Sequence, residues 1–137
     1  MSDSAYMLDN YSTAKNYNMR DCLPDECREG TWLGRAWLPA SFAPSNIAGP
    51  HVITVRDGQV IELSDCFDSI ADITRHPTPT TAVQNATGVS ICSLNTLLDN
   101  SLFYMLPADI RKSQQPSLLA PNDIQAIKAC GVTFVAS

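Results

Sequence analysis

The sequence predicts a small α+β domain in which a β-rich part comes first and short helices follow. Three observations lead to this fold class. The chain has 137 residues, the length of one domain, with 45% hydrophobic and 17% charged residues. Its clearest local pattern is a β-hairpin signature over residues 51–63. Apolar residues recur at helical spacing later in the chain, over residues 89–102.

Residues 1–30 are expected to form a polar extension that precedes the domain. They show no hydrophobic periodicity and contain an acidic cluster of Asp21, Asp25, Glu26 and Glu29. The first twenty residues lack the apolar stretch of a secretory signal. No run of apolar residues approaches the ~18–20 that cross a bilayer, so we expect a cytoplasmic protein.

A three-stranded antiparallel meander is predicted to open the domain. Its first strand is the run around Trp32–Leu38, and its second and third strands are the β-branched runs 51–56 and 59–63. The link between these two runs is only Asp57-Gly58. A two-residue Asp-Gly link is typical of a type I′ turn, which fixes the hairpin.

The elements that follow the meander are shorter. Ser64 or Asp65 is predicted to cap a short helix that ends at Asp72. Residues 76–81 contain two prolines, and each proline keeps its preceding residue out of the helical region. We therefore expect a loop there.

The last third of the chain is predicted to begin with a helix over residues 89–102, because its apolar positions keep helical spacing. These positions are Ile91, Leu94, Leu98 and Leu102. Residues 118–121 should be extended. Residues 124–130 are apolar, but their pattern fits a helix and a strand equally well.

The charge distribution argues against several classes of partner. The net charge is −5, and residues 1–74 carry eleven carboxylates against five basic residues. Residues 75–137 carry three carboxylates against four basic residues, and neither part contains a basic cluster. Since binding to phosphates needs clustered Lys and Arg, we expect neither nucleic acid nor an anionic membrane surface as a partner.

The five cysteines are expected to be free thiols rather than zinc ligands or disulfides. Cys22 and Cys27 are four residues apart, whereas Cys66, Cys92 and Cys130 stand alone. A structural zinc site generally adds a second close pair or histidines. The two histidines, His51 and His76, each adjoin a proline in sequence that we expect to be loop.

Residue patterns typical of catalysis are few. The three glutamates, Glu26, Glu29 and Glu62, form no Glu-x-Glu pair that could hold a hard cation. Asp68 and Asp72 are one helical turn apart, which we interpret as a solvated helix face. The chain has only two histidines and both adjoin prolines, so we do not favour a Ser-His-Asp or Cys-His-Asp triad.

The C-terminal third nevertheless resembles a known enzyme family. The segments are LPADIR (106–111) and SLLAPNDIQAIKACGVTF (117–134). They resemble the junction between the N-terminal and catalytic domains of the fumarylacetoacetate hydrolase superfamily. The branch most similar is that of the bacterial 2-keto-3-deoxy sugar-acid dehydratases, and the resemblance extends weakly back to residue 31.

This resemblance implies a domain organisation and a cofactor. Residues 31–121 would be a small, β-rich, SH3-like N-terminal domain. Residues 122–137 would be the junction and the start of a mixed-β catalytic domain that continues beyond Ser137. Family members use Mg²⁺, or a similar ion such as Mn²⁺ or Ca²⁺, and act as homodimers on 2-keto acids. Their metal ligands lie in the catalytic domain, so no metal ligand is expected in this chain.

The junction motif of the family is roughly Gly-Lys-Asn-Tyr, then two intervening residues and His. Gly131 matches its glycine, Thr133 and Phe134 stand for Asn and Tyr, and Ser137 stands for the histidine. The resemblance thus implies Thr133 and Phe134 as substrate-binding residues and no catalytic residue in this chain. A hydrolase uses the histidine to activate water, so its replacement by Ser137 favours a dehydratase or lyase.

A second reading stays open. The chain could be a non-catalytic β-rich module for binding or dimerisation. Residues 124–135 are mostly apolar, and an exposed apolar segment favours association, so we expect a homo-oligomer in either case.

Overall fold

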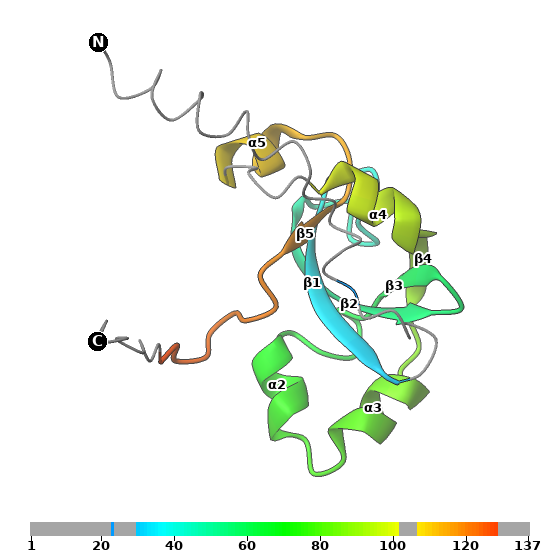
Figure 1. The fold of residues 1–137 in the computed structure, drawn as a ribbon, viewed down its shortest axis with the longest axis vertical. Coiled ribbons are helices and arrows are strands. Elements are labelled where there is room, and N and C mark those ends of the chain that lie inside the picture. Colours follow the sequence, from blue (N-terminus) through cyan, green and yellow to red (C-terminus); the bar gives the residue numbers. More distant parts are fainter. Residues whose placement is uncertain (1–22, 24–29, 102–106, 129–137) are drawn as a thin grey trace, which may run out of the picture.

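The computed structural model describes Leu23, residues 30–101 and residues 107–128. Its centre is a five-stranded antiparallel sheet in the order β4-β3-β2-β1-β5 (Figure 1). The strands are β1 Trp32–Leu38, β2 Gly49–Arg56, β3 Gln59–Glu62, β4 Val89–Ser93 and β5 Ser117–Leu119. The helices are α2 Ile70–Arg75, α3 Pro79–Asn85, α4 Leu94–Asn100 and α5 Pro107–Lys112. The α+β class is confirmed.

The predicted meander is confirmed. β1 pairs with β2 and β2 pairs with β3, both antiparallel. Asp57 and Gly58 both have positive φ angles, 50° and 73°, as a type I′ turn requires. This turn pairs Arg56 with Gln59, and the same register continues along the hairpin to the pair Ile53 and Glu62.

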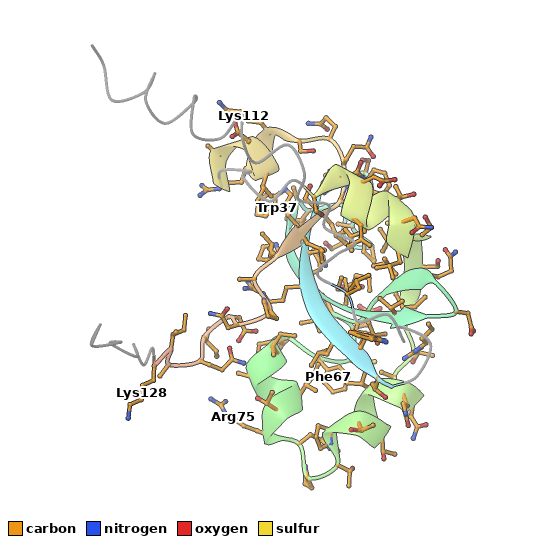
Figure 2. The ribbon with its side chains drawn as sticks, in the orientation of Figure 1. Trp37, Phe67, Arg75, Lys112 and Lys128 are labelled. Atoms are coloured by element: carbon orange, nitrogen blue, oxygen red, sulfur yellow. The ribbon has the colours of Figure 1, made fainter. Side chains whose placement is uncertain are left out.

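The sheet is covered on both faces, and each face has its own apolar core. Helix α4 covers one face, called here the α4 face, whereas α2 and α3 cover the other. The α4-face core contains Ala36, Leu38, Ala43, Ile53, Val60 and Leu97. The opposite core contains Val52, Leu63, Ile70, Ile73, Val83 and Ala86, with Phe67 packed against it (Figure 2). Because side chains alternate along a strand, neighbouring residues such as Val52 and Ile53 serve different cores.

The two helices after the meander differ from prediction. Helix α2 begins at Ile70 rather than near Ser64, because the hydroxyl of Ser69 accepts a hydrogen bond from the Asp72 amide at 3.1 Å. Helix α3 begins at Pro79, inside the stretch that the prolines predicted to be a loop. Proline lacks the amide that would be unsatisfied in a first helical turn, so it starts this helix rather than preventing it.

The predicted helix over residues 89–102 is correct only in its second half. Residues Val89–Ser93 form β4, which pairs with β3, and α4 follows immediately. The hydroxyl of Ser93 caps α4 by accepting a hydrogen bond from the Thr96 amide at 3.1 Å. Pairing with the free edge of β3 overrides the helical spacing in the first half. None of the helices in the described part of the chain is long and apolar enough to cross a membrane.

The extended segment predicted over residues 118–121 is confirmed in its first half, since β5 ends at Leu119 and pairs with β1. The chain beyond it, over residues 120–128, contains neither helix nor strand. Arg35 fastens this segment to β1 by donating to the carbonyls of Asn122 at 2.7 Å and Ala120 at 3.4 Å. The Asp123 carboxylate fastens it to α2 by accepting from the Ile70 amide at 2.5 Å. The segment is therefore tied to both β1 and α2.

We expect Asp123→Asn to destabilise the chain at neutral pH and to have little effect in acid. Burial alone would raise the pKa of Asp123, but amide donors from Ile124, Ile70 and Ala71, together with the Arg35 charge, lower it overall. A lowered folded-state pKa stabilises the fold above the ordinary carboxyl pKa of about 4, and this contribution is lost as the pH falls through the lowered value.

Urea denaturation of wild type and Asp123→Asn between pH 7 and pH 2.5 measures this difference. Asp68→Asn removes an exposed carboxylate that precedes α2 and is the matched control. A wild-type advantage over Asp123→Asn that persists undiminished at pH 2.5 would contradict the proposed contact.

Candidate functional site

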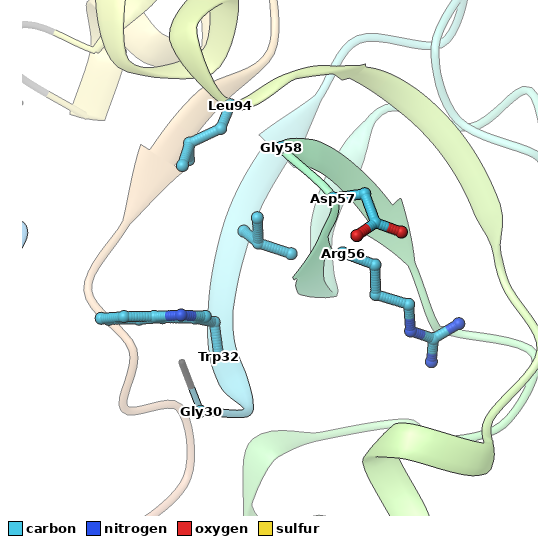
Figure 3. Close-up of a pocket in the computed structure, with 7 residues that line it drawn as sticks. Gly30, Trp32, Arg56, Asp57, Gly58 and Leu94 are labelled. Atoms are coloured by element: carbon cyan, nitrogen blue, oxygen red, sulfur yellow. The ribbon is translucent and has the colours of Figure 1, made fainter. Parts of the chain in front are cut away.

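An open groove of about 750 Å³ lies at the turn end of the hairpin. Figure 3 shows Trp32 and Leu94 on one side of it and Arg56 and Asp57 on the other. Its lining residues are Gly30, Trp32, Val55, Arg56, Asp57, Gly58 and Leu94. Its size falls within the range of ligand pockets.

The Arg56 guanidinium in this groove has a structural role. Arg56 donates to the carbonyl oxygens of Val83 and Ala86, both at 2.7 Å. These carbonyls end α3, so the guanidinium satisfies acceptors that the helix itself leaves unpaired. The apolar end of the groove meets Leu23 across a space of only about 30 Å³. Among its described lining residues there is no nucleophile beside a general base, so this part of the groove offers a largely apolar surface.

A cluster of polar side chains lies within the sheet on its α4 face. His51 Nδ1 is 2.9 Å from Glu62 Oε1 and 3.2 Å from the hydroxyl oxygen of Ser64. Glu62 Oε1 also accepts a hydrogen bond from the Ser64 amide at 2.8 Å. The Glu62 side chain is 2% exposed and that of His51 is 11% exposed.

The hairpin register explains why these three residues meet. Ile53 is opposite Glu62, so two residues further back His51 comes opposite Ser64 on the same face. Glu62 points toward the α4-face core because Val60, two residues earlier, does so as well. His51 lies within β2, opposite Ala36, as the predicted strand 51–56 requires; the loop expected from its neighbouring proline is wrong.

The cluster does not have the geometry of a catalytic triad. In a triad the acid holds one ring nitrogen of the histidine and the nucleophile bonds to the other. Here Glu62 and Ser64 both contact Nδ1 of His51. We conclude that the cluster provides hydrogen-bond partners for the buried Glu62 carboxylate and links His51 in β2 to Ser64, which follows β3.

The sequence-predicted substrate-binding residues Thr133 and Phe134, and Ser137 at the position of the family histidine, lie outside the described residues. Cys22, Cys27 and Cys130 also lie outside them, as do Glu26 and Glu29.

The remaining candidates are separate from one another. Cys66 is an exposed free thiol whose sulfur is 3.3 Å from the Thr87 carbonyl oxygen. Cys92 is a free thiol whose pKa is raised by burial, against a smaller lowering by a backbone hydrogen bond from Leu97. His76 is exposed at the end of α2.

Asp68 and Asp72 are both exposed, as predicted for a solvated face, and Asp72 accepts a hydrogen bond from the Ser69 hydroxyl at 2.7 Å. Within the described ranges no three His, Cys, Asp or Glu side chains lie close enough together to hold a metal ion.

Comparison of the chain with protein-family models, with curated proteins and with solved structures gave no match.

Proposed function

We propose that this chain is the N-terminal module of a fumarylacetoacetate hydrolase-like enzyme that acts on 2-keto acids with a divalent ion. The observation that carries the proposal is the resemblance of residues 117–134 to the domain junction of that family. In the structure the resembling segment starts with strand β5 and then leaves the sheet. A junction between two domains would follow such a path.

The surface of this segment supports the proposal. The side chains of Ile124 and Ile127 are 71% and 77% exposed. Two large aliphatic side chains three residues apart would become buried if a further domain packed there. Lys128 follows directly and points away from the sheet in Figure 2.

The proposal assigns different roles to the two parts of the enzyme. The sheet and its helices form the small SH3-like domain, which positions the junction. The metal ligands and the 2-keto acid site belong to a catalytic domain encoded beyond Ser137. Because Ser137 stands for the family histidine, we favour a dehydratase or lyase over a hydrolase in carbohydrate or aromatic catabolism.

We expect the purified 137-residue chain neither to dehydrate 2-keto-3-deoxy acids nor to bind Mg²⁺ tightly. A Mg²⁺ site needs one or two well-placed carboxylates, which this proposal places downstream. Titration calorimetry with Mg²⁺ and a dehydration assay measure both properties. The same assays on the chain extended by its downstream reading frame should show activity that a chelator abolishes.

Two results would overturn the proposal. One is chelator-sensitive dehydration by the 137-residue chain itself, which would place the site within it. The other is a downstream reading frame that lacks a Glu-x-Glu strand or stops at once. That result favours the second candidate, a non-catalytic module for dimerisation, which the exposure of Ile124 and Ile127 also supports.

We expect the 137-residue chain to form dimers or larger species at micromolar concentration. The exposed isoleucines and the free edges of a sheet both promote association. Sedimentation velocity measures the species present, and the double variant Ile124→Ser with Ile127→Ser should shift them toward monomer. A wild-type chain that is monomeric and binds no hydrophobic dye would contradict this expectation.

A further inference from the structure

A second pocket, of about 310 Å³, lies on the sheet face opposite α4, between β1 and α5. Its lining residues are Arg35, Trp37, Pro50, Ile110, Arg111, Leu119 and Ala120. We call it the Arg35–Arg111 pocket. Helices α2 and α3 cover the other part of this face, around Val52 and Leu63. The pocket is therefore the part of the face that those helices leave open.

The charge of this pocket is opposite to that of the chain. The chain has a net charge of −5, but among the residues that the structure describes the only charged ones lining the pocket are two arginines. Arg35 comes from β1 and Arg111 from the last turn of α5. The two arginines thus line the pocket from different elements of the fold.

Both arginines retain hydrogen-bond donors for a ligand. Arg35 uses one nitrogen, Nη1, to donate to the carbonyls of Asn122 at 2.7 Å and Ala120 at 3.4 Å. A guanidinium has five N–H donors, so Nη2 and Nε of Arg35 are not used by these bonds. Arg111 is exposed, and no ion pair joins it to a carboxylate in the described part of the chain.

Asp123 is a carboxylate that could compete with a ligand for Arg35, because the Arg35 charge helps to lower the pKa of Asp123. Its two carboxylate oxygens, however, accept hydrogen bonds from the amides of Ile70 at 2.5 Å and Ile124 at 2.6 Å. These bonds hold the Asp123 carboxylate at the start of α2. Asp123 does not line the pocket.

The rest of the lining is apolar. Trp37 lies on the side of the sheet near α5, as Figure 2 shows, and Leu119 and Ile110 flank the same space. A pocket with an apolar lining and a few converging polar groups is the usual form of a small-molecule site. Guanidinium groups bind carboxylates with paired, charge-assisted hydrogen bonds.

We infer that the Arg35–Arg111 pocket binds a small carboxylate whose apolar body is about the size of a phenyl ring. The carboxylate lies between the two guanidinium groups, and the apolar body contacts Trp37 and Leu119. This inference goes beyond the proposed enzyme function and does not rest on it.

The test is an NMR titration of the ¹⁵N-labelled 137-residue chain with sodium phenylacetate. The indole N–H resonance of Trp37 reports on the pocket, and the variant Trp32→Phe assigns it by removing the other indole. We expect saturable shifts of this resonance and of the Leu119 and Ala120 amides, with a Kd on the order of 1 mM. Phenylacetate lacks a 2-keto group, so its binding is independent of the proposed catalysis.

Arg111→Gln should weaken phenylacetate binding about tenfold, because it removes a charge-assisted pair. Lys112→Gln removes the same charge from the next residue of α5, which does not line the pocket, and should leave the Kd unchanged. The dispersed spectrum of each variant shows that it is folded.

The other arms of the experiment identify the recognised chemistry. Phenethyl alcohol has the same apolar body without the charge, and inorganic phosphate has charge without the body; both should bind at least about tenfold more weakly than phenylacetate. Equal binding of either compound, the absence of saturable shifts, or an equal effect of Arg111→Gln and Lys112→Gln would each overturn the inference.

Discussion

Gly88→Ala is expected to lower the free energy of unfolding by about 3 kcal/mol, since a side chain forced into a filled space costs this much or more. A β-carbon on Gly88 would lie 2.2 Å from the Glu62 carbonyl oxygen and 2.6 Å from a methyl group of Ile61. It would also lie 2.8 Å from a methyl group of Leu63. The first of these atoms belongs to the backbone of β3, which cannot move without disturbing its pairing with β2 and β4.

Gly49→Ala is the matched control, because a β-carbon at Gly49 would meet no atom within 4 Å. It should change the free energy of unfolding by less than about 0.5 kcal/mol. Urea denaturation of both variants measures the difference. Equal midpoints for the two variants would show that the chain before β4 does not approach β3 as closely as described.

Glu62→Ala is expected to cost about 3 kcal/mol, because it removes a buried carboxylate together with its hydrogen bonds. The His51 ring and the Ser64 amide would each lose the acceptor that Glu62 provides at 2.9 Å and 2.8 Å. A cavity beside the α4-face core would add to the loss.

Glu62→Gln keeps the shape and one accepting oxygen of the side chain, so we expect it to cost about 1 kcal/mol, the value of a weakened hydrogen bond. Thermal and urea denaturation of both variants at pH 7 provide the comparison. If Glu62→Ala were no more destabilising than Glu62→Gln, the hydrogen bonds of the cluster would not contribute to the fold.

The sequence predicts the meander well because its turn is local. Asp57-Gly58 determines both the turn type and the strand register, and neither depends on the rest of the chain. The same register places His51 opposite Ser64, so the contact between them was accessible from the sequence. The burial of Glu62 could not be predicted from the sequence. β3 has an apolar residue on each face, so the order of its apolar and polar residues does not show which face is buried or that Glu62 lies on it.

The errors arise where tertiary contacts decide the local structure. Residues Val89–Ser93 have the spacing of a helix but complete the edge of β3. Pro79 indicated a loop but is the first residue of α3. Carbonyls at the end of α3 then accept hydrogen bonds from Arg56 of β2, a contact that the local sequence does not show. The Arg35–Arg111 pocket also has no local signature, since its two arginines are 76 positions apart in the sequence.

The pairing of β5 with β1 has a consequence for the order of folding. It joins only three residue pairs, and its central pair, Ala36 with Leu118, spans 82 positions of the chain. The hairpin contacts close loops of a few residues and form early, whereas closing so long a loop is slow and entropically costly. The meander therefore provides the template, and β5 joins it late. For the same reason we expect β5 to detach first under tension or local opening, which leaves the segment after Leu119 held by its hydrogen bonds with Arg35 and Ile70 while the rest of the sheet remains folded.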